Sequence, residues 1–311
     1  MNSTVKNSTV SNLKDYYIVC PLSASFGLLS VMISMMIMII VRCSKRRLHT
    51  VRHLLMCNTC IASAIYCIVQ TINYIFLIFI PWETSNVLCR WRGYFGYMSI
   101  SAAAYSYLIQ AVSRLFFSKF STKYPWLLTF KTHYYLILIH WSIVFIIPLP
   151  SVITKDIYFR PGLLCWVPLK STIHVGYTVF AYYLVPIFFI MVIYIDIYRR
   201  IKKANKRAEM VLNTTNDKRD LEVFRNIVIL LAIYITGGIP TVIFIIFAMH
   251  LFYLVGIVTI TLSIFIEKIC TIALDRELRL VVSNKIFKKN LVVAIENTIT
   301  RTKYPATSRR P

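Results

Sequence analysis

Residues 89–124 read CRWRGYFGYMSISAAAYSYLIQAVSRLFFSKFSTKY. After Arg92 the stretch carries small, apolar and aromatic side chains, and no charge until Arg114. A helix from Cys89 to Arg114 is about 40 Å long, more than the roughly 30 Å hydrocarbon core of a bilayer. The stretch therefore predicts a membrane-spanning helix, with Cys89 at one face and Arg114 at or just inside the other. An arginine at that depth is costly, so it either has a function or snorkels to the interface.

The composition of the whole chain agrees with a membrane protein. Of 311 residues, 58% are hydrophobic and 15% are charged, against about 25% charged in soluble proteins, and the mean hydropathy is +0.65. Several apolar runs approach or exceed the ~20 residues that span a bilayer as a helix. These runs do not alternate as barrel strands do. We therefore expect an all-α membrane protein.

The apolar runs predict a seven-transmembrane helix bundle over residues 16–274, after a tail at 1–15. The last two spans are separated by only a few residues, because the apolar region 223–274 is too long for one crossing. The expected spans are roughly 16–41, 53–80, 87–117, 132–151, 173–198, 223–248 and 251–274.

The distribution of positive charge sets the orientation. The first, third and fifth connections hold 17 Lys and Arg residues, against 7 in the N-terminus and the even connections. Cytoplasmic loops carry the excess of positive charge, so we expect an extracellular N-terminus. Glycosylation sequons at Asn2 and Asn7 agree with this. The net charge of +23 follows membrane topology and does not indicate nucleic-acid binding.

The cysteines predict a disulfide and no metal site. Cys20, Cys89 and Cys165 fall on the oxidising side, which allows one bridge and one cysteine left over. We favour Cys89–Cys165, because Cys89 begins the third span and Cys165 lies in the longest outer loop. Cys57 and Cys60 form a C-x2-C inside an apolar run without a second pair, which is more typical of helix packing than of a metal site. We expect no cofactor.

After the last span the pattern changes. Apolar residues recur at helical spacing over 274–286, and basic residues take the other positions. The pattern predicts a short amphipathic eighth helix at 275–290 on the inner leaflet. A polar cytoplasmic tail follows at 291–311.

Several single residues share a spacing that is known from one family. Besides Cys89 and Arg114, 25 residues apart, these are Trp82, Trp141, Pro186, Tyr194, Pro240 and the LDRELR segment at 274–279. Over about 16–290 the chain resembles the rhodopsin-like (class A) family of G-protein-coupled receptors. The resemblance implies a multi-pass plasma-membrane receptor with a heterotrimeric G protein as its cytoplasmic partner.

The chain departs from the family pattern at several motifs. The D-R-Y motif is Ser113-Arg114-Leu115, the span-six tryptophan is Gly238, and N-P-x-x-Y is replaced by residues 267–271. The span-two aspartate maps to Ser63. These changes remove most of the family's sodium pocket.

The resemblance implies activation roles for Arg114, Tyr194, Asp220, Pro240 and Glu267. Arg114 and Asp220 would form an inactive-state lock; alternatively, Asp220 only caps its helix. Two interpretations of the charges at 267 and 268 stay open. In one, Glu267 faces the bundle core as a substitute acid; in the other, it sits in a hydrated inner cavity and its neighbour snorkels inward.

The resemblance also places a ligand pocket in the outer half of the bundle. The residues carried over by position are Arg92, Gly96, Tyr97, Ile100, Thr178, Tyr182, Thr241, Ile245, Ile257 and Thr261. Gly96 stands where amine receptors have an aspartate, and Thr261 where opsins have a lysine, so an amine or retinal is not expected. A tyrosine-rich cup with a basic rim (Arg92, Lys155, Arg160) suits a peptide or an acidic lipid; the alternative is an interfacial tyrosine belt.

We therefore expect a receptor that couples an unknown extracellular ligand, a peptide or lipid rather than an amine, to G-protein activation through outward movement of the sixth helix. A non-signalling receptor or scaffold is the alternative, and a transporter or channel a weaker one. No nucleophile–base pair or metal cluster indicates an enzyme.

Overall fold

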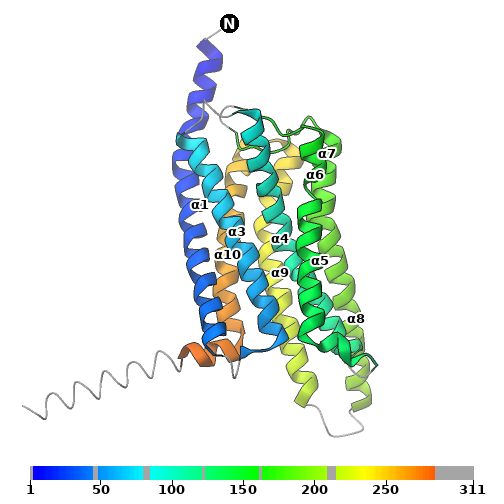
Figure 1. Cartoon of the computed structure of the whole chain (residues 1–311). Helices are drawn as coiled ribbons and strands as arrows, with labels where there is room; N and C mark the ends of the chain where they lie inside the picture. The colour runs from blue at the N-terminus through cyan, green and yellow to red at the C-terminus, as the bar shows by residue number, and fades with distance from the viewer. Residues whose placement is uncertain are drawn as a thin grey trace, which may run out of the picture.

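The computed structural model describes residues 3–44, 48–79, 85–120, 123–160, 163–208 and 215–283. For 3–13, 201, 203–208, 215–227 and 231 it describes the backbone alone. The fold is all-helical, as predicted (Figure 1). Its elements are α1 (Ser3–Cys43), α3 (Val51–Phe79), α4 (Asn86–Lys119), the 3₁₀ turn η1 (Pro125–Leu128), α5 (Phe130–Ile146), α6 (Leu149–Ile153), α7 (Thr172–Val179), the π-helical turn η2 (Phe180–Leu184), α8 (Val185–Ala208), α9 (Thr215–Phe247) and α10 (His250–Leu274).

Six of the described helical segments are long and apolar enough to cross a membrane. They are Lys14–Cys43, Val51–Phe79, Phe130–Ile153, Thr172–Arg200, Val228–Phe247 and His250–Leu274. The helix missing from this set is α4, the stretch from which the fold was predicted. It is 34 residues long, but its tyrosines, serines and glycines lower its hydropathy.

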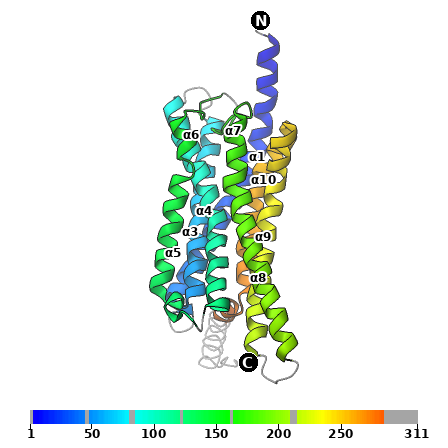
Figure 2. The same cartoon turned by 90° about the vertical axis from the view of Figure 1, so that its right-hand side faces the viewer.

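The low hydropathy of α4 follows from its position. It packs against α3, α5 and α8, and the two views show it among the other long helices rather than at the edge of the bundle (Figures 1 and 2). Buried serines return their hydroxyls to the helix backbone, as Ser99 does to the Gly96 carbonyl and Ser106 to the Ala103 carbonyl. A helix surrounded by other helices needs few lipid-facing apolar side chains, so its mean hydropathy can be low even when it crosses a membrane.

The break between the last two helices lies where the sequence placed it. α9 ends at Phe247 and α10 begins at His250. Between them Ala248 has a positive φ of 53°, the left-handed conformation that often ends a helix.

The fifth span contains a wide turn with a clear cause. Pro186 has no N–H to give to the carbonyl four residues earlier, and its ring crowds that carbonyl. The chain responds with the π-helical turn Phe180–Leu184 directly before it. The Tyr105 hydroxyl donates a hydrogen bond of 2.9 Å to the Ala181 carbonyl in this turn, so α4 supplies a partner to backbone that the wide turn exposes.

The N-terminal helix begins earlier than expected from the sequence. α1 begins at Ser3, so helical backbone runs through the segment expected as a tail, and its first turns project beyond the bundle (Figure 1). Asn2 lies outside the described residues, and the side chain of Asn7 is not described. Residues 276–283 are helical after Asp275, and the description ends at residue 283. The amphipathic helix at 275–290 stays a prediction.

Glycine brings α9 and α10 into close contact. A Cβ atom at Gly237 would lie 2.1 Å from the Ser263 Oγ and 2.5 Å from the Ser263 Cβ. At the next position, a Cβ at Gly238 would meet only Tyr183 Cε1, at 3.6 Å. The Thr259 hydroxyl donates a 3.0 Å hydrogen bond to the Gly237 carbonyl at the same point.

We therefore expect Gly237→Ala to destabilise the bundle by about 1–3 kcal/mol, because the added methyl group overpacks a helix contact that cannot yield without moving backbone. The neighbouring Gly238→Ala has room and is the matched control, which should leave stability unchanged or slightly raised. Thermal unfolding of the purified protein in detergent measures both. Equal effects of the two substitutions would contradict the close approach.

Candidate functional site

The outer end of the bundle is covered by the loop that carries Cys165. A disulfide joins Cys165 to Cys89 at the start of α4, with the Cα atoms 5.3 Å apart, which is the predicted pair. The loop also needs Gly93 one turn further along α4. A Cβ there would lie 2.4 Å from the Cys165 carbonyl oxygen, so only glycine lets the loop sit this close.

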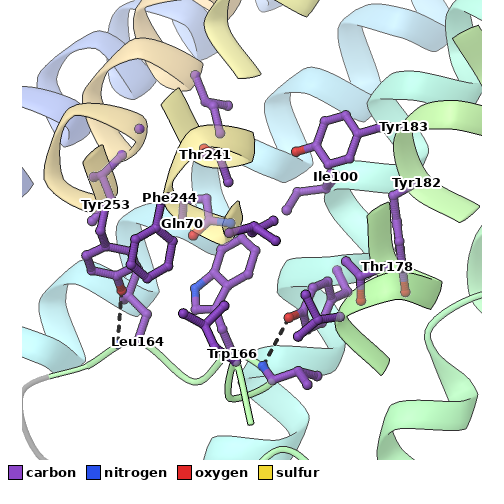
Figure 3. A pocket seen from close by; sticks show the side chains of 18 of the residues that line it. Gln70, Ile100, Leu164, Trp166, Thr178, Tyr182, Tyr183, Thr241, Phe244 and Tyr253 are labelled. Carbon is purple, nitrogen blue, oxygen red and sulfur yellow. Dashed lines mark hydrogen bonds between the residues drawn. The ribbon is translucent and has the colours of Figure 1, made fainter. Parts of the chain in front are cut away.

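Tyrosines from two helices hold this loop in place. The Val167 N–H donates a 3.0 Å hydrogen bond to the Tyr97 hydroxyl of α4, and the Leu164 N–H donates one of 3.3 Å to the Tyr253 hydroxyl of α10 (Figure 3). Between these anchors the Trp166 ring packs edge-on against Tyr97, with centroids 5.1 Å apart. The loop is thus fixed to α4 and α10 by hydrogen bonds as well as by the disulfide.

Beneath the loop lies a cavity of about 100 Å³, here called the outer cavity. Among the described residues its lining contains no Asp, Glu, Lys or Arg. The side chains are aromatic, aliphatic or hydroxyl-bearing, with the exception of Gln70 (Figure 3). The lining is Tyr66, Gln70, Tyr74, Tyr97, Ile100, Leu164, Trp166, Val167, Leu169, Val175, Thr178, Tyr182, Tyr183, Thr241, Phe244, Ile245, Tyr253, Gly256, Ile257 and Ile260.

Seven of the ten residues expected in a ligand pocket line this cavity. They are Tyr97, Ile100, Thr178, Tyr182, Thr241, Ile245 and Ile257. The other three lie beside it. Gly96 adjoins Gln70. The Thr261 hydroxyl is hydrogen-bonded to Ser23 of α1 at 2.7 Å. Arg92 points to a separate small cavity next to Phe76.

Two of the three residues of the expected basic rim, Arg92 and Arg160, make structural contacts. The Arg92 guanidinium stacks over the Phe76 ring at 4.4 Å and donates to the Cys165 sulfur at 3.0 Å. The Arg160 guanidinium donates to the Trp166 carbonyl at 3.0 Å. These two cations hold the loop and do not line the outer cavity.

Sequence reasoning missed the lining residues that come from α3 and the covering loop. Gln70 was detectable as a strongly polar residue inside an apolar run. Trp166 directly follows Cys165 of the predicted disulfide, so its position near the outer end of the bundle could have been predicted. The contribution of Tyr183 was not detectable, because the π-helical turn lets Tyr182 and its neighbour line the same cavity.

A second cavity, of about 50 Å³, lies at the opposite end of the bundle and is here called the inner cavity. It combines charges of both signs. Its lining is Arg52, Met56, Thr59, Cys60, Gln110, Arg114, Leu230, Glu267, Lys268, Thr271, Leu274 and Asp275. Arg114 therefore lines a polar cavity, and its role in activation stays a prediction.

Two adjacent residues form a buried ion pair in this cavity. The Lys268 Nζ lies 2.8 Å from a Glu267 carboxylate oxygen, and both side chains are at most 2% exposed. The Thr271 hydroxyl donates to the Glu267 backbone carbonyl at 2.8 Å and lies 3.3 Å from its carboxylate. Lys268 does not snorkel out of the bundle. Although the Cα–Cβ bonds of Glu267 and Lys268 diverge, the long Lys268 side chain bends back to the Glu267 carboxylate.

At the rim of the inner cavity, Asp275 joins three segments. Its carboxylate lies 2.9 Å from Arg52 Nη2 and accepts a 3.0 Å hydrogen bond from the Leu278 N–H. The His53 Nε2 is 3.7 Å away, a close neighbour but beyond hydrogen-bond distance. Burial raises the pKa of Asp275, but His53, Arg52 and the Leu278 N–H outweigh burial and lower the pKa to about 2. Asp275 thus stays ionised and ties α3 to the turn after α10.

The remaining predicted activation residues have distinct environments. Tyr194 is buried in the same core cluster as Tyr234, and Pro240 lies inside α9. Ser113, in the place of the family's acid, is hydrogen-bonded to His133 of α5 at 2.9 Å. The side chain of Asp220 lies outside the description, so the lock with Arg114 stays a prediction.

Comparison with known proteins identifies this architecture. The family model for the 7 transmembrane receptor (rhodopsin family) matches residues 34–274, which cover α3 to α10 and the last part of α1, residues 34–43. No curated protein matches the chain significantly.

The buried ion pair gives a test of the inner cavity. Breaking such a pair leaves one buried charge uncompensated and costs about 3–5 kcal/mol, whereas removing both charges together is close to neutral. We expect Glu267→Gln and Lys268→Met each to lower thermal stability and surface expression, and the double variant to recover most of the loss. Additive losses in the double-mutant cycle would show that the two charges act independently.

Asp275 gives a pH-dependent prediction. Its depressed pKa means that its contribution to stability is complete above the ordinary carboxylate pKa and is lost as pH falls through about 2. At neutral pH, Asp275→Asn should cost about 1–3 kcal/mol, and the difference from wild type should shrink as pH falls from about 4. Asp196→Asn, in an exposed pair with Arg200, is the control and should have little effect. A stability difference between wild type and Asp275→Asn that does not change with pH would contradict a stabilising role of the ionised carboxylate.

Proposed function

The chain belongs to the rhodopsin family of seven-transmembrane receptors, and from this premise we propose that it transduces binding of an extracellular ligand into activation of a heterotrimeric G protein. The family gives a receptor role rather than an enzymatic one. The ligand and the coupling to G protein are inferred from the two cavities.

The observation that carries the proposal is that four helices line both cavities. α3, α4, α9 and α10 each contribute to the outer cavity and again to the inner cavity. A ligand that fills the outer cavity best in one arrangement of these helices therefore also selects the shape of the inner cavity. This is reciprocal coupling through a population shift.

The moving element in this proposal is α9. Its residue Leu230 forms part of the inner cavity wall, and Thr241, Phe244 and Ile245 form part of the outer one. Pro240 interrupts the helix between these two parts, because a proline inside a helix removes one backbone hydrogen bond. Outward movement of the Leu230 end would loosen the core cluster that Leu230 shares with Tyr194. It would also widen the inner cavity around Arg114 and Glu267, and G protein would enter there.

The lining of the outer cavity favours a small, largely apolar ligand, lipid-like rather than an amine. Without a carboxylate in the described lining, a buried ammonium would have no counter-charge and would bind poorly. A peptide remains compatible only through an apolar end that enters the cavity. The arginines of the expected rim have structural partners, so an acidic head group gains little from them.

The membrane arrangement follows from the same premise. α4 also crosses the membrane in this proposal and, with the six apolar helices, brings the number of crossings to seven. The membrane is the plasma membrane, the N-terminus lies outside, and Asn2 and Asn7 carry sugars. The helical residues 276–283 begin the amphipathic eighth helix on the inner leaflet. Asp275 would set its position, because its carboxylate accepts a hydrogen bond from the Leu278 N–H. Leu278 in turn packs with Ile37 of α1 and with Leu48 in the segment after α1.

A non-signalling receptor or scaffold is the second candidate, favoured by the altered motifs. Ser113 gives its hydrogen bond to His133 rather than restraining Arg114, and Gly238 stands where the family has an aromatic side chain. These differences change how the bundle switches, while both cavities are retained.

G-protein activation without added ligand tests the proposal. We expect cells expressing the wild type to show basal activation above untransfected cells, Arg114→Ala to abolish most of it, and Asp220→Ala to raise it. Arg42→Ala, an exposed arginine at the end of α1, is the matched control and should behave as wild type. All variants are compared at equal surface expression across the Gα classes. Signals equal to untransfected cells throughout would favour the non-signalling candidate.

A further inference from the structure

Gln70 of α3 is the residue in the outer cavity that the packing of the protein leaves unexplained. Its side chain is 2% exposed, and neither its amide nitrogen nor its amide oxygen has a hydrogen-bond partner among the described residues. A buried primary amide without partners is costly, because it gives up its bonds to water and receives none in return. Native structures rarely keep such a group without a role for it.

Several other polar groups around the cavity are already engaged. The hydroxyls of Tyr97 and Tyr253 accept the loop N–H groups described above. The Tyr74 hydroxyl accepts a hydrogen bond from Ser23 at 3.2 Å, and the Thr178 hydroxyl donates to the His174 carbonyl at 2.7 Å. Gln70 thus brings to the cavity lining a donor and an acceptor that are both buried and without a hydrogen-bond partner among the described residues.

The neighbour of this amide on α4 is a glycine. A Cβ at Gly96 would lie in ordinary contact with two amide nitrogens, 3.6 Å from Asn73 Nδ2 and 3.9 Å from Gln70 Nε2. A large side chain at position 96 would cover the amide. The sequence instead places glycine there, and Figure 3 shows Gln70 among the side chains that surround the cavity.

We propose that Gln70 determines ligand specificity, by selecting an uncharged, mostly apolar ligand that carries a hydrogen-bond donor and acceptor side by side, as a carboxamide does. This inference rests on the proposed function, in which the outer cavity is the ligand site. A primary or secondary carboxamide pairs with both atoms of the glutamine amide, accepting from its N–H and donating to its oxygen. A carboxylate or an ammonium satisfies only one of them and brings a charge that the lining does not neutralise.

The test uses four probes with one apolar chain and different head groups. They are octanamide, heptyl methyl ketone (which replaces the amide nitrogen with a methyl group), octanoate and octylammonium. Binding is measured by ligand-induced thermal stabilisation of the whole protein in nanodiscs. The proteins are wild type, Gln70→Leu and Thr71→Val. Thr71 is the matched control, because it adjoins Gln70 in sequence but its hydroxyl donates to the Cys67 carbonyl and it does not line the cavity.

We expect wild type and Thr71→Val to bind octanamide about tenfold more tightly than the ketone. In Gln70→Leu this ratio should fall to about one, while affinity for the ketone is kept or improved. Partitioning of probes into lipid cancels, because the same ratio is compared between proteins. A second variant, Thr241→Trp, fills the cavity and should abolish binding of both neutral probes.

Other results would overturn the inference. An amide preference that survives in Gln70→Leu, or equal binding of amide and ketone to wild type, would show that Gln70 does not select the ligand and that water satisfies its amide. Tightest binding of octanoate or octylammonium would overturn the uncharged class, as would the absence of binding by all four probes. None of these results decides G-protein coupling, which the activation assay tests separately.

Discussion

The constraint on which this fold depends is that lipid offers no partner to a polar group. Polar side chains in the bundle therefore turn toward another helix, toward a cavity or back to a carbonyl of their own helix. α4 shows the result most clearly, because its low hydropathy reflects polar side chains satisfied within protein. Ser113 bonds to His133, Gln110 donates to Thr59 at 2.6 Å, and the Ala102 carbonyl lies 3.1 Å from His140 Nε2. The polar interior holds the helices in one register, and it concentrates the remaining polar groups at the two cavities.

Close backbone approach is the second element of the architecture, and glycine supplies it at specific points. Gly93 admits the disulfide-bonded loop, while Gly237 and Gly256 bring α9 against α10. Apolar side chains alone hold helices together weakly in lipid, where tails are as apolar as leucine, so small residues and interhelical hydrogen bonds matter more. The contact at Gly237 has both, since Thr259 bonds to the carbonyl of that residue. Two helices joined by a tight turn at Ala248 thus behave as a closely packed pair.

Much of the fold could be predicted from the sequence, because bilayer thickness, loop charge and cysteine placement act on runs of residues and need no knowledge of contacts. The helix break near residue 248 and the Cys89–Cys165 bridge were predicted in this way. Pairings within the bundle were not accessible. Side chains at adjacent helix positions diverge, yet the flexible Lys268 side chain reaches the Glu267 carboxylate. The two arginines expected at the rim of the pocket form hydrogen bonds to the covering loop instead. Seven cavity residues were placed by position in the family, whereas Gln70 was not, since that pattern carries no information about an unpaired amide.

The layer between the two cavities contains the residues through which the proposed coupling would act. Tyr66, Tyr183 and Tyr234 surround a small void of about 10 Å³ beside Gly238, where the family has an aromatic ring on α9. Tyr66 and Tyr183 also line the outer cavity, and Tyr234 packs against Tyr107 of α4 with ring centroids 5.7 Å apart. Close-packed interiors transmit displacement. Any coupling between the cavities has to cross this layer. In this chain tyrosines from α3, η2 and α9 would therefore share the repacking that a single α9 aromatic performs elsewhere in the family.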